Sequence, residues 1–209
     1  MKYKLVIFDF DGTLADSFPY FMSTVNILAE TYHFPPIDPV KVDQMRGMDA
    51  RQLLKNSRIP AWKVPLIANA FIRMMGRDIG QIPLFTGIAD LIKKLTTQGV
   101  RIAIVSSNSE QNIRRVLGPE TASLITYYGC GTSLFGKQHK FKKAMTSLGL
   151  KPHEVLCVGD EMRDQEAAEK SGMAFGAVAW GYTRADVFEN QPGIAVFYSV
   201  EDIARACWG

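Results

Sequence analysis

The sequence predicts an α/β fold in which a doubly wound, Rossmann-like parallel sheet carries an inserted all-helical sub-domain. Short apolar or β-branched runs recur along the 209-residue chain and alternate with segments of helical spacing. This alternation is typical of a parallel sheet with helices on both faces. Roughly ninety residues separate the first run from the second, although a strand–helix unit needs only about 30. An insertion is therefore expected after the first strand.

Four strong runs predict the buried strands, and two weaker runs would bring the sheet to about five or six strands. The strong runs cover residues 5–8, 101–105, 154–158 and 175–179, and the weaker ones cover 124–128 and 195–198.

The inserted segment has no convincing strand between residues 17 and 80. Its apolar residues recur at helical spacing, as in Phe21, Val25 and Leu28. We therefore expect a core domain of residues 1–15 and 84–209 and a helical cap domain of residues 16–83. Segments 14–17 and 81–86 are the candidate hinges between them.

Composition narrows the classes of function. The chain is 47% hydrophobic and 22% charged, with a formal net charge of +3. The charges are scattered, so nucleic-acid binding is not expected. There is no apolar run long enough for a signal peptide or a membrane span. The three cysteines lack C-x-x-C spacing and predict reduced core thiols. These features predict a cytoplasmic protein without a membrane partner.

Two carboxylates end the first strand, in the run Asp9-Phe10-Asp11-Gly12-Thr13. The alternation of side chains along a strand directs Asp9 and Asp11 the same way, at the edge where α/β folds bind ligands. Such a pair suits Mg²⁺, and one carboxylate could act as nucleophile and the other as general acid/base. Gly12 permits a tight turn whose N–H could face an anion. The alternative is that both aspartates only cap the turn.

Two later strands also end in polar residues. Ser106, Ser107 and Asn108 open a helix, where hydroxyls and N–H groups bind phosphate well, although such residues also cap helices. Asp160 follows a further strand and could complete a cation site begun by Asp9, or merely favour a helix N-terminus together with Asp164.

A lysine near residues 137–140 could offset the charge of a phosphate, although a lone lysine on a helix is usually solvated. Because the carboxyl ends of parallel strands share one edge, we expect these groups to converge.

The motifs, taken in order, resemble those of the haloacid dehalogenase superfamily of phosphatases. The run D-F-D-G-T-L-A-D is similar to the first motif, Ser106 to the second, Lys137 to the third, and G-D-E-M-R-D to the fourth. The likeness covers nearly the whole chain. It implies a Mg²⁺-dependent phosphatase that acts on a small phosphorylated molecule.

The resemblance also implies roles for individual residues. Asp9 would attack phosphorus and form an aspartyl-phosphate, while Asp11 would protonate the leaving alcohol and later activate water. Mg²⁺ would be held by the Asp9 carboxylate, the Asp11 backbone carbonyl and Asp160, and Asp164 would steady its waters or Lys137.

The second and third motifs imply phosphoryl contacts. Ser106 and Lys137 would contact the phosphoryl group, with Ser107 and Lys140 as alternatives.

The cap resembles that of the branch containing phosphoglycolate phosphatases, β-phosphoglucomutases and phosphonoacetaldehyde hydrolases. Arg46 and Gly47 resemble its specificity loop, and Arg51 and Lys55 follow on the next helix. Either arginine could hold a substrate carboxylate or second phosphate, or belong to a solvated face. The competing functions are a phosphomutase, a phosphonatase that uses Lys55, and a non-catalytic phospho-receiver switch.

Overall fold

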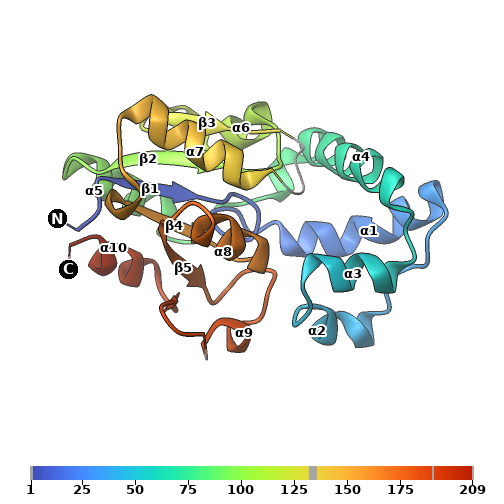
Figure 1. The fold of residues 1–209 in the computed structure, drawn as a ribbon. Coiled ribbons are helices and arrows are strands. Elements are labelled where there is room, and N and C mark those ends of the chain that lie inside the picture. The colour runs from blue at the N-terminus through green and yellow to red at the C-terminus, as the bar shows by residue number, and fades with distance from the viewer. Residues whose placement is uncertain (1, 132–135, 190, 209) are drawn as a thin grey trace.

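A single six-stranded sheet forms the centre of the protein. The computed structural model describes residues 2–131, 136–189 and 191–208. All strands are parallel and lie in the order β3-β2-β1-β4-β5-β6 (Figure 1). Their bounds are β1 Leu5–Phe8, β2 Arg101–Val105, β3 Tyr127–Gly129, β4 Val155–Gly159, β5 Ala174–Val178 and β6 Ala195–Phe197. The predicted doubly wound α/β fold is confirmed, and its order reverses between β1 and β4, where such sheets bind ligands.

The strand bounds differ slightly from those that the sequence predicts. The first two strong strands match, whereas β4 begins one residue later and β5 one residue earlier than expected. Glu154 is excluded from β4 because it ends a short turn, in which its N–H donates to the carbonyl of Lys151. The weaker strands β3 and β6 have three residues each and lie at the two edges of the sheet; β3 begins three residues later and ends one residue later than expected, and β6 ends one residue earlier.

Helices cover both faces of the sheet. The core helices are α5 Ile88–Thr97, α6 Glu110–Ser123, α7 Lys137–Leu148, α8 Met162–Glu169, α9 Asp186–Glu189 and α10 Val200–Trp208. Val6 and Phe8 of β1 pack in one buried cluster with residues of α5, α6 and α10. Leu5 and Ile7 pack in the other, with residues of α7, α8 and α9. This alternation is why β1 is apolar at every position.

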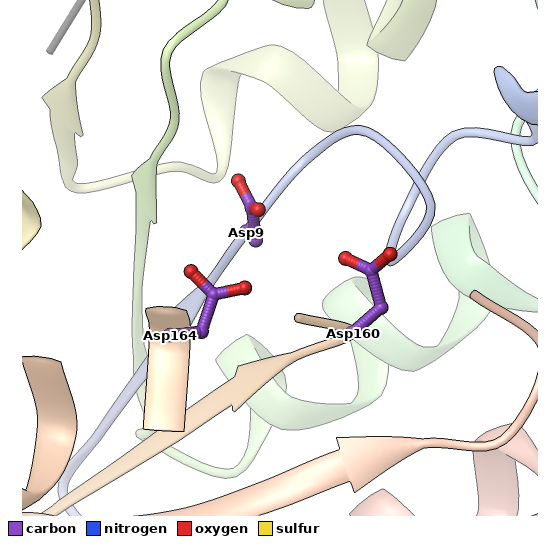
Figure 2. A group of neighbouring side chains, drawn as sticks. All are labelled: Asp9, Asp160 and Asp164. Atoms are coloured by element: carbon purple, nitrogen blue, oxygen red, sulfur yellow. The ribbon is translucent and has the colours of Figure 1, made fainter. Parts of the chain in front are cut away.

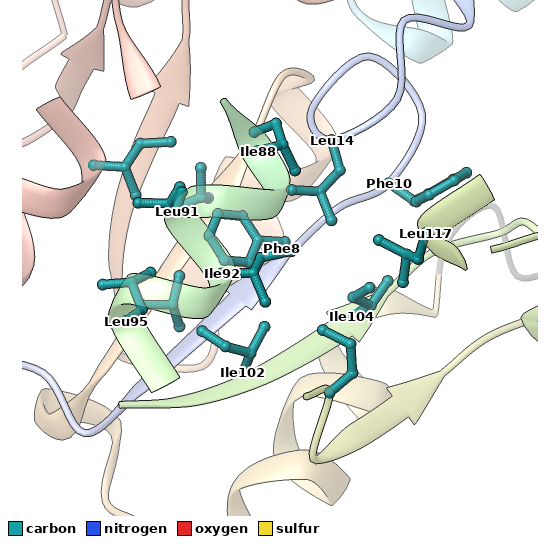
Figure 3. Packing of buried hydrophobic residues seen from close by; sticks show 14 of the residues in the cluster. Phe8, Phe10, Leu14, Ile88, Leu91, Ile92, Leu95, Ile102, Ile104 and Leu117 are labelled. Carbon is teal, nitrogen blue, oxygen red and sulfur yellow. The ribbon is translucent and has the colours of Figure 1, made fainter. Parts of the chain in front are cut away.

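The packing of α5 against β1 and β2 shows why the sequence folds this way. Ile88, Leu91, Ile92 and Leu95 recur at helical spacing, and all are buried against Phe8 and its neighbours (Figure 3). Burying each such side chain contributes about 1.5–3 kcal/mol before entropy is counted. The strand ends that carry the polar residues are thus held by a rigid core.

The inserted segment is helical, as predicted. It contains α1 Phe18–Tyr32, α2 Val42–Met45, α3 Ala50–Ser57 and α4 Val64–Arg77. These four helices lie together beyond the carboxyl ends of the strands, away from the two termini (Figure 1). We refer to them as the cap. None of the helices in the described ranges is long and apolar enough to cross a membrane.

The two connections between the cap and the sheet lie side by side. Ala15 and Leu84 form an antiparallel bridge, and the N–H of Asp16 donates to the carbonyl of Pro83 over 2.9 Å. The paired segments coincide with the predicted hinges, and the division into residues 1–15 with 84–209 and residues 16–83 stays a prediction.

Candidate active site

Three aspartates, two at the ends of neighbouring strands and one on the helix that follows, meet at the topological switch point. Asp9 follows β1, Asp160 follows β4, and Asp164 lies in the first turn of α8. One carboxylate oxygen of each lies within 4.8 Å of those of the other two, and all three residues are buried (Figure 2). The sequence placed these residues at one edge of the sheet, and the structure brings them together.

Lys137 joins this cluster from the start of α7. Its Nζ donates to Asp9 Oδ2 over 2.5 Å and also to Asp164 Oδ1. The side chain of Lys137 is only 4% exposed, so both ion pairs are shielded from solvent. Lys140, the alternative lysine, instead donates to the backbone carbonyls of Ser106 and Gly131.

Asp160 is fixed by its own neighbours. Its Oδ1 accepts a hydrogen bond from the Thr13 hydroxyl over 2.9 Å, and its Oδ2 accepts one from the N–H of Tyr182 over 2.7 Å. Gly12, in the turn after β1, has φ +74°, and a Cβ there would lie 2.3 Å from Asp160 Oδ2. A side chain at position 12 would therefore displace the carboxylate.

The clustered charges perturb one another strongly. Burial, reinforced by the charges of Glu161 and Asp9, raises the pKa of Asp160 well above its usual value. Burial also raises the pKa of Asp164 to about 7, even though Lys137 opposes the shift. Burial alone would lower the pKa of Lys137, but Asp164 and Asp9 outweigh it and raise that pKa. Ionising all three aspartates in this buried setting would leave an excess of negative charge that Lys137 alone does not compensate.

This excess fits a divalent cation. Three aspartates and one lysine leave two uncompensated negative charges when all are ionised, and the donors of the triad are all oxygens. Hard cations such as Mg²⁺ prefer this ligand set over one with Cys or His. The Asp11 carboxylate does not belong to the cluster; the family resemblance implies that its backbone carbonyl, rather than its side chain, is a ligand of the metal.

Asp11 occupies a different environment from Asp9. Strand β1 ends at Phe8, so the side-chain alternation of a strand does not continue to residue 11. Both oxygens of Asp11 accept hydrogen bonds from Asn108 Nδ2, over 3.3 and 3.0 Å. Burial and the nearby charge of Asp9 raise the pKa of Asp11 to about 6, against hydrogen bonds from Asn108 and Ser17. A carboxyl with this pKa can both donate and accept a proton near neutral pH.

Asn108 is itself held by a second amide that reaches the cap. Asn112 Nδ2 donates to Asn108 Oδ1 over 3.1 Å and to the carbonyl of Ile72, on α4, over 2.9 Å. Both amides are buried. The structure therefore places the Asn108 side chain on Asp11, whereas the sequence analysis assigned it to substrate.

The two serines of the second motif differ in exposure. Ser106 is buried, and its Oγ accepts a hydrogen bond from the N–H of Asn108 over 3.1 Å. Ser107 is partly exposed and lines a cavity between the cap and the sheet together with Asp11.

Two cavities lie between the cap and the sheet, each of about 260 Å³. The inner cavity is lined from the sheet side by Asp11, Ser107, Glu161, Arg163 and Tyr182, and from the cap side by Phe21, Val25, Leu28, Ile59, Val64, Ile67, Ala68, Phe71 and Ile72. The outer cavity shares Phe21, Glu161, Arg163 and Tyr182 with it and extends to Arg46, Met48 and Leu53. An apolar wall facing a few polar groups is typical of a small-molecule site.

The cap residues that the sequence suggests for substrate binding differ in whether they lie near the cavities. Arg46 donates from Nε to the carbonyl of Tyr182 over 3.0 Å and from Nη2 to that of Gly181 over 2.9 Å. Gly47 lies beside the guanidinium of Arg184. Arg51 and Lys55 are exposed and line neither cavity. Arg46 thus fastens the cap to the loop after β5, and two of its donor atoms are already occupied.

Sequence reasoning missed four residues of this site: Thr13, Asn112, Arg163 and Tyr182. Thr13 lies within the first motif and Arg163 within the fourth, so their proximity to the aspartates was available as a signal. Nothing in the sequence marks Asn112 or Tyr182, because each reaches the site from a segment without a motif.

Fold and site together define an α/β enzyme whose candidate reacting groups are carboxylates at the ends of adjacent parallel strands. The sequence profile of the haloacid dehalogenase-like hydrolase family matches residues 6–178. The chain belongs to this family and is a hydrolase that acts on phosphoric monoesters.

Individual relatives agree with this assignment. The chain is 34% identical over 180 residues to the phosphoglycolate phosphatase of Synechococcus elongatus, covering 86% of this chain and 85% of the relative. It is 24% identical over 190 residues to the N-acetylmuramic acid 6-phosphate phosphatase of Pseudomonas aeruginosa, covering 87% and 84%. A predicted phosphatase from Clostridium acetobutylicum superposes with a TM-score of 0.82 at 17% identity, covering 100% and 99%; this likeness concerns the fold.

Proposed function

We propose that the protein is a Mg²⁺-dependent phosphatase that hydrolyses a small phosphomonoester through an aspartyl-phosphate on Asp9. One observation carries the proposal: two aspartates two residues apart are held in opposite electrostatic settings. Asp9 pairs with the Lys137 ammonium over 2.5 Å, which places a cation beside the proposed nucleophile. Among the described residues no cation pairs directly with Asp11, and burial together with the charge of Asp9 raises its pKa to about 6, which suits proton transfer.

The reaction then runs in two steps. A carboxylate oxygen of Asp9 attacks phosphorus, the bond from phosphorus to the ester oxygen breaks, and Asp11 gives its proton to the departing alkoxide. Asp11, now a carboxylate, takes a proton from a water that attacks the aspartyl-phosphate, and the bond between Asp9 and phosphorus breaks to release phosphate. Both aspartates are thereby restored to their starting forms.

The remaining residues position and stabilise. Lys137 offsets negative charge on the transferring phosphoryl group, and Ser106 contributes a hydroxyl at the end of β2. Asp9, Asp160 and Asp164 would hold the Mg²⁺, with the backbone carbonyl of Asp11 as a further ligand. When bound, the ion supplies charge stabilisation for the phosphoryl oxygens. The cap covers the site and limits the access of water.

The size of the substrate follows from the space above Asp11. The inner and outer cavities share lining residues, and each of them, at about 260 Å³, is small beside the range of about 300–1,000 Å³ for common ligand pockets, which favours a small organic group. The relatives are named for phosphoglycolate and for N-acetylmuramic acid 6-phosphate, two phosphorylated acids, so a substrate screen should begin with phosphorylated acids.

Phosphate release tests the proposal directly. The wild-type protein with Mg²⁺ is assayed on a panel of phosphomonoesters, beside Asp9→Asn and Asp11→Asn. Asp9→Asn should abolish turnover while the circular dichroism spectrum is retained, because the covalent route is lost. Asp11→Asn should slow turnover by roughly 100-fold or more. Metal-dependent turnover by Asp9→Asn above a trace would contradict the assignment, and interconversion of hexose phosphates without phosphate release would indicate a mutase.

The choice of metal has its own test. Chelator-treated protein should regain activity with Mg²⁺ and not with Zn²⁺, because the triad offers only oxygen ligands. Full recovery with Zn²⁺ alone would count against a magnesium site.

A further inference from the structure

Arg163 lies at the junction of the two cavities and has no role in the two reaction steps of the proposed function. It lies at the second position of α8, one residue before Asp164. Together with Phe21, Glu161 and Tyr182 it lines both the inner and the outer cavity. A group bound beside Asp11 and Ser107 would therefore meet the Arg163 side chain.

The guanidinium of Arg163 is only partly satisfied. Its Nη2 donates to Glu161 Oε1 over 2.6 Å, whereas its Nε is buried and has no hydrogen-bond partner among the described residues. The side chain is 22% exposed. A guanidinium has five N–H donors in a planar fork, and unmet buried donors in native proteins are rare and often mark functional positions. Arg163 thus has N–H groups that no acceptor among the described residues occupies.

Other cations near the site are already engaged. Lys137 pairs with two aspartates, Lys140 donates to backbone carbonyls, and Arg46 uses Nε and Nη2 on the loop after β5. Among the described residues that line the inner cavity, Arg163 is the one cationic side chain. The cap residues that line the inner cavity with Arg163 are apolar, so on that side they offer no side-chain acceptor for its free donors.

We propose that Arg163 selects the substrate class: it binds a carboxylate carried by the organic part of a small phosphomonoester while the phosphoryl group lies at Asp9. This inference rests on the proposed phosphatase function and adds the residue that recognises the acid group of the substrate. A carboxylate can accept two parallel hydrogen bonds from a guanidinium, which matches the donors that Glu161 leaves free. Glu161 balances the charge of Arg163 in the absence of substrate and keeps its side chain turned toward the cavities.

The location explains why a core residue, and not the predicted cap residues, would recognise the acid. Arg163 follows Asp160 and precedes Asp164 on the same short segment, so its position relative to the phosphoryl site is set by the rigid sheet edge. Arg51 belongs to the cap and is exposed. A short substrate can span the phosphoryl site and Arg163 without any cap cation.

A matched pair of substrates tests the proposal. The value of kcat/KM is measured for 2-phosphoglycolate and for 2-hydroxyethyl phosphate, which replaces the carboxylate with a neutral alcohol. The proteins are wild type, Arg163→Met, Arg163→Lys and the control Arg205→Met, which removes an exposed arginine of α10. For Arg163→Met we expect a loss of roughly 10- to 100-fold on phosphoglycolate, as for a lost charged hydrogen bond, and less than about threefold on the neutral ester. Arg163→Lys should keep part of the preference, because it retains the charge but not the fork.

The other outcomes separate this inference from the function on which it rests. Equal losses on both substrates would overturn it, because Arg163 would then only support the site, and so would a wild-type preference for the neutral ester. Wild-type inactivity on every ester would overturn the proposed phosphatase function itself. If Arg163→Met does not fold, Arg163→Lys is compared with wild type in calorimetric titrations in the Asp9→Asn background. There, equal affinities of wild type and variant for 2-phosphoglycolate would overturn the inference.

Discussion

The ion pairs of the buried Lys137 ammonium can be tested by a stability measurement that needs no substrate. Replacing it with methionine keeps most of the side-chain volume but removes the charge that contacts Asp9 and Asp164. Breaking a buried ion pair by removing one partner costs about 3–5 kcal/mol, because the remaining charges stay buried. Lys137 is 4% exposed and bonded to two carboxylates. The substitution Lys137→Met should therefore lower the free energy of unfolding by about 3–5 kcal/mol.

The assay is chemical and thermal unfolding in chelator at pH 7.5, followed by circular dichroism. For a chain of this length about 1 kcal/mol corresponds to 2–4 °C, so Tm should drop by roughly 6–20 °C. The matched control is Lys140→Met, whose Nζ, among the described residues, donates to the carbonyls of Ser106 and Gly131 and pairs with no carboxylate. It should lose less than about 2 kcal/mol.

The loss should also depend on pH. Burial raises the pKa of Asp164 from 3.8 to about 7, so the folded state binds more protons than the unfolded state between these values. Stability from this group therefore falls as pH rises through that window. Lys137 lowers the pKa of Asp164, so its removal raises that pKa further and the deficit of Lys137→Met should be larger at pH 8 than at pH 5. A deficit below about 1 kcal/mol, or one equal to that of Lys140→Met, would refute the reasoning.

Two further predictions concern Asp11 and the cap. In the pH–rate profile, the limb that reports the ionisation of Asp11 should have its midpoint near pH 6. In Asn108→Ala it should move up by about 0.5–1 pH unit, because the lost hydrogen bond favoured the carboxylate; an unchanged limb would show that Asn108 does not act on Asp11. Arg46→Ala should lower kcat/KM by roughly tenfold on charged and neutral esters alike, because its bonds to the loop after β5 hold the cap closed. Arg51→Ala should leave both values unchanged, and a loss confined to anionic esters in either variant would restore the role in substrate recognition that the sequence suggested.

The sequence by itself determined the fold and the edge of the sheet at which the site lies. The apolar runs of β1, β2, β4 and β5 are strong signals because a parallel strand covered on both faces has no solvent-facing positions. The long gap after β1 predicted the insertion, and helical spacing predicted its class. Asp9 and Asp160 follow two such strands directly, so topology alone brings them to one edge.

Only the tertiary structure shows which of the candidate site residues are in contact with one another. Lys137 and Lys140 lie on the same helix and are equivalent as sequence letters, but only Lys137 reaches Asp9 and Asp164. The different settings of Asp9 and Asp11 also arise in the fold, because the ion pair of Asp9 with Lys137 and the raised pKa of Asp11 both depend on burial and on groups contributed by distant segments.

The recognition surface depends most on the fold. Arg46 was a candidate for binding substrate because its motif resembles a specificity loop, and the structure shows two of its donors on backbone carbonyls of the core. Arg163 lies within the fourth motif, but the sequence does not show that it faces a cavity, since whether an arginine is solvated or lines a cavity depends on which helices pack around it. Local sequence patterns predict strands, turns and helices. The side chains that line a cavity between the cap and the sheet depend instead on contacts between residues more than one hundred positions apart, such as the hydrogen bonds of Arg46.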